Sequence, residues 1–95
     1  MSITLETAVT RNSEILHAPV GTEGAVLMSV EAGHYYGLNA VASRVWELLA
    51  IPRTIAQLCK QICEEFEIDT PTCEVTVLKF VRELVDNGIV REATG

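Results

Sequence analysis

The stretch that decides the fold is residues 33–49, GHYYGLNAVASRVWELL. Its first part has strand character, and because strand side chains alternate, Tyr35 and Tyr36 must point to opposite faces of a sheet. Asn39 then suits a helix N-cap, and the apolar residues after it recur at helical spacing. That stripe consists of Val41, Val45, Leu48 and Leu49. The chain therefore changes from strands to helices at about residue 38.

Short extended segments precede this point. Strand patterning is found at residues 3–9, 14–19, 25–30 and 34–38. Pro19 lacks an amide hydrogen, so it ends its segment or lies on a sheet edge. Glycine-containing turns at residues 21–24 and 31–33 separate the later segments. We expect these later segments to form a small antiparallel meander.

Two more helices are predicted after the first. Thr54 and Gln57 have the spacing of a capping box at the start of the second helix. Thr70 is predicted to cap the third, with Pro71 at the first helical position and Gly88 just past its end. The second helix has an apolar face formed by Ile55, Leu58, Cys59, Ile62 and Phe66.

The fold class is therefore α+β, a winged helix-turn-helix-like arrangement in which a three-stranded antiparallel sheet precedes three helices. Residues 1–95 form a single domain, and residues 1–12 are an N-terminal extension with a candidate extra strand. Residues 89–91 are predicted to be an extended tail.

Composition excludes several classes of protein. Hydrophobic residues make up 48% of the chain and charged residues 21%, so it is not a disordered tail. It has neither a membrane-spanning apolar run nor a secretory signal, so we expect a cytoplasmic protein without a membrane partner. The formal net charge of −6 repels phosphate backbones, so nucleic acid is not an expected partner.

The third helix, residues 73–85, carries more apolar surface than one core requires. At about 100° per residue, one stripe is formed by Cys73, Val77, Phe80 and Leu84. A second apolar shoulder is formed by Val75, Leu78 and Val85, with the cation of Arg82 among them, and Lys79 is a further candidate for peptide contact. This shoulder either extends the core beneath the sheet or forms one wall of a peptide-binding groove.

The strand at residues 34–38 is the predicted second wall. An unpaired strand edge beside an apolar helix face is what strand addition requires, because backbone hydrogen bonds hold the peptide and pockets select its side chains. Either Tyr35 or Tyr36 faces the peptide. The candidate residues on this wall are Gly33, His34, Tyr35, Tyr36, Gly37 and Leu38.

The sequence offers less support for a metal-binding or catalytic site than for a peptide-binding one. Cys59 and Cys63 lie one helical turn apart, but no Cys-x-x-Cys pair is present, so we expect neither a metal site nor a cofactor. His17 and His34 lie in the strand region without a catalytic signature. We therefore predict a binding module that is not an enzyme.

The pattern resembles the PqqD family. The resemblance rests on residues 33–39 and 42–49, together with the Asn87-Gly88-Ile89-Val90 ending, and covers about residues 14–92. It implies a recognition element for ribosomally made, modified peptides, in which the leader of the precursor adds to the strand at 34–38 and packs against the third helix.

Within that family, the chain is most similar to the stand-alone leader-binding proteins of lasso-peptide pathways. Their partners are a leader protease and a macrolactam synthetase. An alternative is a chaperone that presents a precursor to a radical-SAM enzyme. A winged-helix transcription factor is less favoured, because the third helix balances Lys79 and Arg82 against Glu74, Glu83 and Asp86. A metal- or thiol-based enzyme is least favoured.

Overall fold

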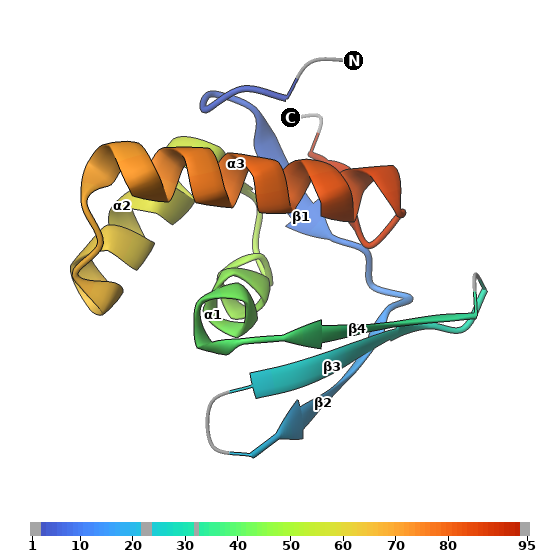
Figure 1. The fold of residues 1–95 in the computed structure, drawn as a ribbon. Coiled ribbons are helices and arrows are strands. Elements are labelled where there is room, and N and C mark those ends of the chain that lie inside the picture. The colour runs from blue at the N-terminus through green and yellow to red at the C-terminus, as the bar shows by residue number, and fades with distance from the viewer. Residues whose placement is uncertain (1–2, 22–23, 32, 94–95) are drawn as a thin grey trace.

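The structure, a computed structural model, describes residues 3–21, 24–31 and 33–93. Within these residues the chain forms two small antiparallel sheets and three helices (Figure 1). The predicted α+β class, with a three-stranded sheet before three helices, is confirmed. The predicted turns at 21–24 and 31–33 include Thr22, Glu23 and Ala32, which lie outside the described residues.

The first sheet has the strand order β2-β3-β4. Its strands are β2 (Leu16–Val20), β3 (Gly24–Ser29) and β4 (His34–Leu38). Leu27 of β3 pairs with His17 on one side and Tyr36 on the other. Ala25, Leu27 and Leu38 are buried, so one face of the sheet covers the core.

The three helices are α1 (Ala40–Leu48), α2 (Ile55–Phe66) and α3 (Thr70–Asp86). The side chain of Asn39 accepts a hydrogen bond from the amide of Ala42 at 2.9 Å, which confirms the predicted N-cap of α1. The predicted capping box of Thr54 and Gln57 is also confirmed. Local side-chain chemistry thus defines where α1 and α2 begin.

The predicted cap of α3 is wrong by one residue. Asp69 is the N-cap, and its carboxylate accepts hydrogen bonds from both the amide and the hydroxyl of Thr72. Thr70 is therefore the first helical residue, and Pro71 still lies in the first turn, where its missing amide hydrogen is tolerated. Gly88 follows the helix with a φ of +74°, as predicted.

The second sheet was not predicted from the sequence. β1 (Ala8–Arg11) lies between β5 (Arg53–Thr54) and β6 (Val90–Glu92). The strand expected at 3–9 is wrong in its boundaries, because the amide of Thr7 bonds to the carbonyl oxygen of Thr4 and turns the chain before Ala8. The extended tail expected at residues 89–91 is present as β6 and pairs with β1.

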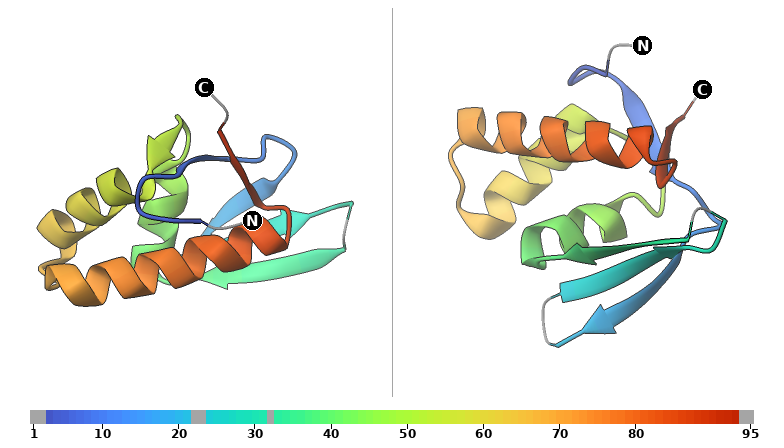
Figure 2. Two further views of the ribbon diagram at one scale, coloured as in Figure 1. Left: turned by 90° about the horizontal axis from the view of Figure 1, so that it is seen from above. Right: turned by 45° about the vertical axis from the view of Figure 1, so that its right-hand side comes forward.

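Helix α1 lies between the first sheet and the layer formed by α2 and α3 (Figures 1 and 2). Trp46 of α1 is 2% exposed and belongs to a core that all three helices share. On α3, Val81 is fully buried whereas Phe80 is only partly buried, so the predicted core stripe is rotated towards Val81. None of the described helices combines the length and apolar character needed to cross a bilayer.

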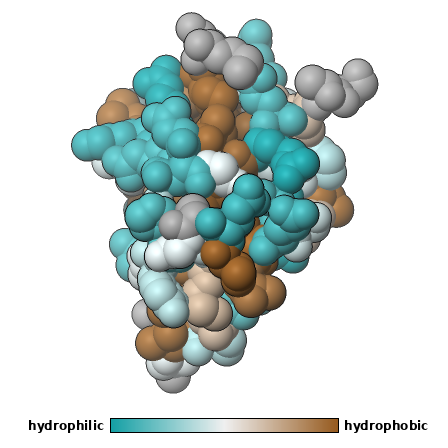
Figure 3. Space-filling model, turned by 90° about the vertical axis from the view of Figure 1, so that its right-hand side faces the viewer, coloured by the Kyte–Doolittle hydropathy of each residue, from teal (hydrophilic) through white to brown (hydrophobic). Residues whose placement is uncertain are grey.

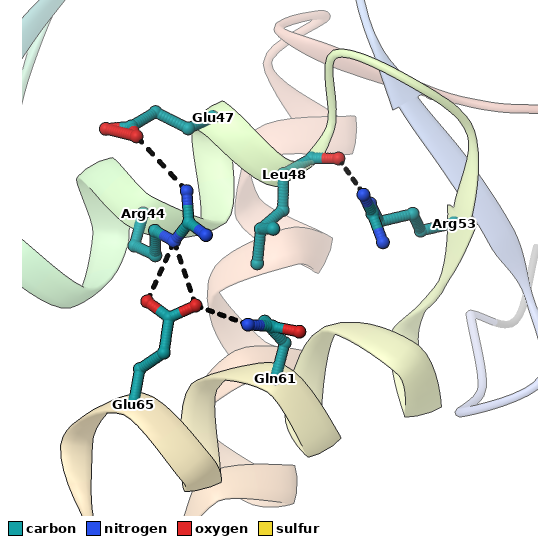
Figure 4. Close-up of polar contacts among 6 residues, drawn as sticks. All are labelled: Arg44, Glu47, Leu48, Arg53, Gln61 and Glu65. Atoms are coloured by element: carbon teal, nitrogen blue, oxygen red, sulfur yellow. Dashed lines mark hydrogen bonds and ion pairs between the residues drawn. The ribbon is translucent and has the colours of Figure 1, made fainter.

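A polar connection joins α1 to α2 (Figure 4). The guanidinium of Arg44 donates from Nε to the carboxylate of Glu65 at 2.8 Å and also contacts Glu47. At the end of α1, Arg53 donates from Nε to the carbonyl oxygen of Leu48 at 2.7 Å. This second bond satisfies a carbonyl that has no partner within the helix.

Candidate peptide-binding site

Strand β4 is an edge strand. It pairs with β3 on one side, and in the described part of the chain no strand pairs with its other side. Backbone amide and carbonyl groups point alternately to the two sides of a strand, so half of those in β4 are directed away from β3. This edge can accept an extended chain.

The two tyrosines of β4 lie on opposite faces of the sheet, as their spacing requires. Tyr36 is partly buried, packs against the core and pairs with the buried Leu27. Tyr35 is 74% exposed and pairs with Met28 on the outer face. Any strand added beside β4 inherits this alternation, so its side chains point in turn towards the core face and the outer face.

Within the described residues, the outer face is apolar and carries no charged side chain. By the alternation of the three strands it consists of Leu16, Ala18, Val20, Val26, Met28 and Tyr35. Leu16 and Val20 are each about half exposed. The end view in Figure 3 shows hydrophobic and pale side chains at the lower end of the molecule, where Figure 1 places this sheet.

A cleft of about 250 Å³ lies between α1 and α3. Asn39, the residue directly after β4, lines it, whereas none of the described β4 residues does. Its walls are mostly apolar side chains; those from α1 are Val41, Ala42 and Val45, and those from α3 include Thr76, Val77 and Phe80. The cleft has the size and polarity to hold one apolar side chain of a bound chain.

The α3 residues predicted to contact a peptide do not line this cleft. Leu78 and Val85 are partly buried and pack against the core, whereas Val75 is 69% exposed. Nη2 of Arg82 donates to the carbonyl oxygen of Ile3 at 2.9 Å. The N-terminal segment accordingly lies along one side of α3, away from β4 (Figure 2, left).

Helical geometry separates the two sets of residues. Phe80 and Arg82 are two residues apart, so they lie roughly 160° from each other around α3. Lys79 is exposed on the intervening surface. The cleft therefore brings Thr76 and Phe80 of α3 together with Asn39, the residue after β4, and Arg82 lies on the opposite flank of α3. A role for the Arg82 flank in peptide binding stays a prediction.

Sequence reasoning missed the cleft residues because it assigned them to the core. Val41 and Val45 recur at i and i+4 immediately after Asn39, and this spacing predicts an apolar stripe of α1 rather than a cleft. The spacing of Phe80 likewise predicts a core position on α3. The signal available in the sequence was the position of Val41 and Val45, which follow closely after β4.

The three cysteines are free thiols that lie close together. Cys59 and Cys73 are buried, Cys63 is half-buried, and Sγ of Cys73 lies 3.6 Å from the carbonyl oxygen of Cys59. Burial, together with the neighbouring thiols of Cys63 and Cys59, raises the pKa of Cys73 to about 12. Among the described residues no group of three His, Cys, Asp or Glu side chains could hold a metal ion.

An exposed strand edge, followed directly by a residue of an apolar cleft, defines a module able to hold an extended chain. The sequence model of the family described as coenzyme PQQ synthesis protein D (PqqD) matches residues 24–90. The chain belongs to the PqqD family, and the resemblance predicted from its sequence is confirmed.

Among solved structures, the chain is similar to one described as TbiB1 in complex with the TbiA(beta) leader peptide. The two chains are 28% identical and superpose with a TM-score of 0.78, over 90% of this chain and 99% of that one. A comparison with curated protein sequences finds no significant match.

Proposed function

We propose that this chain binds the leader segment of a ribosomally synthesised precursor peptide by strand addition to β4. The observation that carries the proposal is the unpaired edge of β4, which is followed directly by Asn39 of the cleft between α1 and α3. Membership of the PqqD family supports it, as does similarity to a protein whose structure contains a leader peptide.

In this proposal the backbone of β4 provides affinity and the cleft provides selectivity. Leader residues on the same face as Tyr36 and Leu38 point towards α1 and α3, and one apolar side chain enters the space beside Val45 and Phe80. Leader residues in line with Tyr35 and Gly37 point outward. The leader should therefore carry apolar residues at alternate positions.

The test is fluorescence anisotropy with the labelled leader that is encoded beside this gene. Thr76→Lys places an ammonium group at the rim of the cleft and should weaken binding at least about tenfold, because an unpaired charge is costly against apolar groups. Val75→Lys is the matched control, because Val75 is the adjacent residue, is exposed, and does not line the cleft. Both variants should keep the wild-type melting temperature.

The results separate the two flanks of α3. Loss of affinity in Val75→Lys with none in Thr76→Lys would move the site to the flank of Arg82. The absence of saturable binding by the wild-type chain up to high micromolar leader would contradict the proposed function itself.

We further propose that the bound leader is presented to a leader protease and a macrolactam synthetase of a lasso-peptide pathway, in the cytoplasm. The proposed role assigns no catalytic residue to this chain. The alternative is presentation of a precursor to a radical-SAM enzyme, which the description of the family as a coenzyme PQQ synthesis protein favours. Purified leader protease should cleave the precursor peptide faster in the presence of the wild-type chain than in the presence of Thr76→Lys. If the wild-type chain does not accelerate this cleavage, the radical-SAM alternative is favoured.

A further inference from the structure

A second pocket, of about 440 Å³, lies where β1, β2 and the end of α1 meet. It shares no lining residue with the cleft described above. Its lining is mainly polar and consists of Thr10, Arg11, Asn12, Ser13, Ile15, His17, Trp46 and Ala50. A polar pocket of this size, away from the proposed leader edge, is unexplained by strand addition.

Trp46 organises the two basic side chains of this pocket. The guanidinium carbon of Arg11 lies 5.0 Å from the centroid of the indole ring, which is a cation–π contact. The imidazole of His17 meets the same ring edge-on, with centroids 6.2 Å apart. Since Trp46 is 2% exposed, a rigid core residue holds both groups in place.

The cation–π contact with Trp46 does not supply a hydrogen-bond acceptor for the N–H groups of Arg11. The N–H groups of Arg11 lie in the plane of the group and can form the fork that matches a carboxylate. In the described part of the chain no carboxylate forms an ion pair with Arg11, whereas Arg44 has two such partners. The donors of Arg11 are therefore available to a ligand.

The charge around the pocket also favours an anion. The chain has a formal net charge of −6, yet among the described residues no Asp or Glu lines this pocket. The indole Nε1 of Trp46 is buried and has no hydrogen-bond partner among the described residues. Asn12 and Thr10 already use their side chains on backbone groups, which leaves Ser13 as a further hydroxyl donor.

We propose that this pocket is a carboxylate-binding site in which the guanidinium edge of Arg11 binds the anion, while His17 and Ser13 supply further hydrogen bonds. The carboxylate belongs either to a small free acid or to an acidic side chain of a partner protein. The site goes beyond leader binding and does not depend on it.

The chain contains one tryptophan, and it lies in the site, so the indole N–H resonance of Trp46 reports binding directly. The probes are disodium succinate and a capped hexapeptide of alternating glutamate and glycine. Succinamide and sodium chloride at matched ionic strength serve as controls. Both carboxylate probes should shift the resonance saturably, and neither control should.

Arg11→Gln should weaken carboxylate binding at least about tenfold, since it removes a charge-assisted hydrogen bond. Lys60→Gln removes an exposed positive charge from α2 and should bind as the wild type does. His17→Gln, at an exposed position, provides a second variant should Arg11→Gln fold poorly. Peptide binding at least tenfold tighter than succinate binding would identify a protein partner, and equal affinities a small acid.

Two results would overturn the proposal. The first is the absence of any saturable shift with either carboxylate probe. The second is an equal response in the wild type, Arg11→Gln and His17→Gln, which would mean that Arg11 only covers Trp46.

Discussion

Arg82 and Ile3 are 79 residues apart in the sequence, yet Nη2 of Arg82 donates to the carbonyl oxygen of Ile3 at 2.9 Å. Ile3 itself is only 5% exposed and belongs to the hydrophobic core. The amide of Ala56 bonds to the carbonyl oxygen of Leu5, so the same segment is also held by α2. The segment from Ile3 to Leu5 is thus packed against both α2 and α3.

This contact predicts a stability effect for Arg82. Arg82→Ala should lower the free energy of unfolding by about 1 kcal/mol, because it removes one hydrogen bond from a charged donor at a partly buried position. Ile3→Ala should lower it by more, about 2–4 kcal/mol, because it leaves a cavity in the core. Urea denaturation followed by Trp46 fluorescence measures both. Unchanged stability of Arg82→Ala together with lost leader binding would return Arg82 to the peptide site.

Two carboxylates predict how stability depends on pH. Hydrogen bonds from Arg44 lower the pKa of Glu65, and those from Thr72 lower the pKa of Asp69. A lowered carboxyl pKa stabilises the folded chain above the unfolded pKa, and this contribution is lost as pH falls through the folded pKa. Unfolding free energy should therefore be level near neutrality and decline below about pH 4.

The control for this dependence is the variant pair Glu65→Gln and Asp69→Asn. Each removes one titrating group, so each should flatten the decline in acid relative to wild type. Chemical denaturation at pH 3, 4, 5 and 7 provides the comparison. A decline of the same steepness in both variants would assign the acid sensitivity to other carboxylates.

Helix caps could be predicted from the sequence, whereas the pairing of strands that are distant in the chain could not. Asn39 and the Thr54–Gln57 pair were predicted correctly as caps because a cap depends on residues within one turn. β5 is only two residues long, and its pairing with β1 joins distant segments that have no shared pattern. A short strand without alternation gives no periodic signal, so the second sheet was missed.

The same limit applies to the candidate site. The edge position of β4 follows from its place at the end of a meander, and that part was predicted. A helical wheel gives the faces of α3 but not the element beside each face. The carbonyl oxygen of Ile3 accepts a hydrogen bond from Arg82 on one flank of α3, whereas Thr76 and Phe80 line the cleft shared with α1.

The cysteines should differ in reactivity although they lie close together. Alkylation needs a thiolate, and burial raises the pKa of both Cys59 and Cys73. Iodoacetamide at pH 8 should therefore label the half-buried Cys63 first, and the other two only when the chain unfolds. Peptide mass spectrometry locates the label, and urea-treated protein serves as control. Early labelling of Cys73 in folded protein would contradict the packing between α2 and α3.

Substitutions of the two tyrosines of β4 should differ in their effect on the free energy of unfolding, because Tyr36 is partly buried and Tyr35 is exposed. Tyr36→Ala removes a ring that packs on the core opposite Leu27, so it should lower the free energy of unfolding by about 2–3 kcal/mol and weaken leader binding. Tyr36→Phe keeps the aromatic ring and should retain most of the stability and most of the leader affinity. Tyr35→Ala acts at a 74% exposed position and should change stability by no more than about 0.5 kcal/mol.

Leader affinity then shows which face of the added strand determines selectivity. If the core face selects the leader, Tyr35→Ala binds as the wild type does, because leader side chains in line with Tyr35 point outward. Anisotropy titrations of the three variants with one labelled leader give the comparison. A large loss of affinity in Tyr35→Ala, with Tyr36→Phe unaffected, would show that the uncharged outer face, rather than the cleft between α1 and α3, selects the leader.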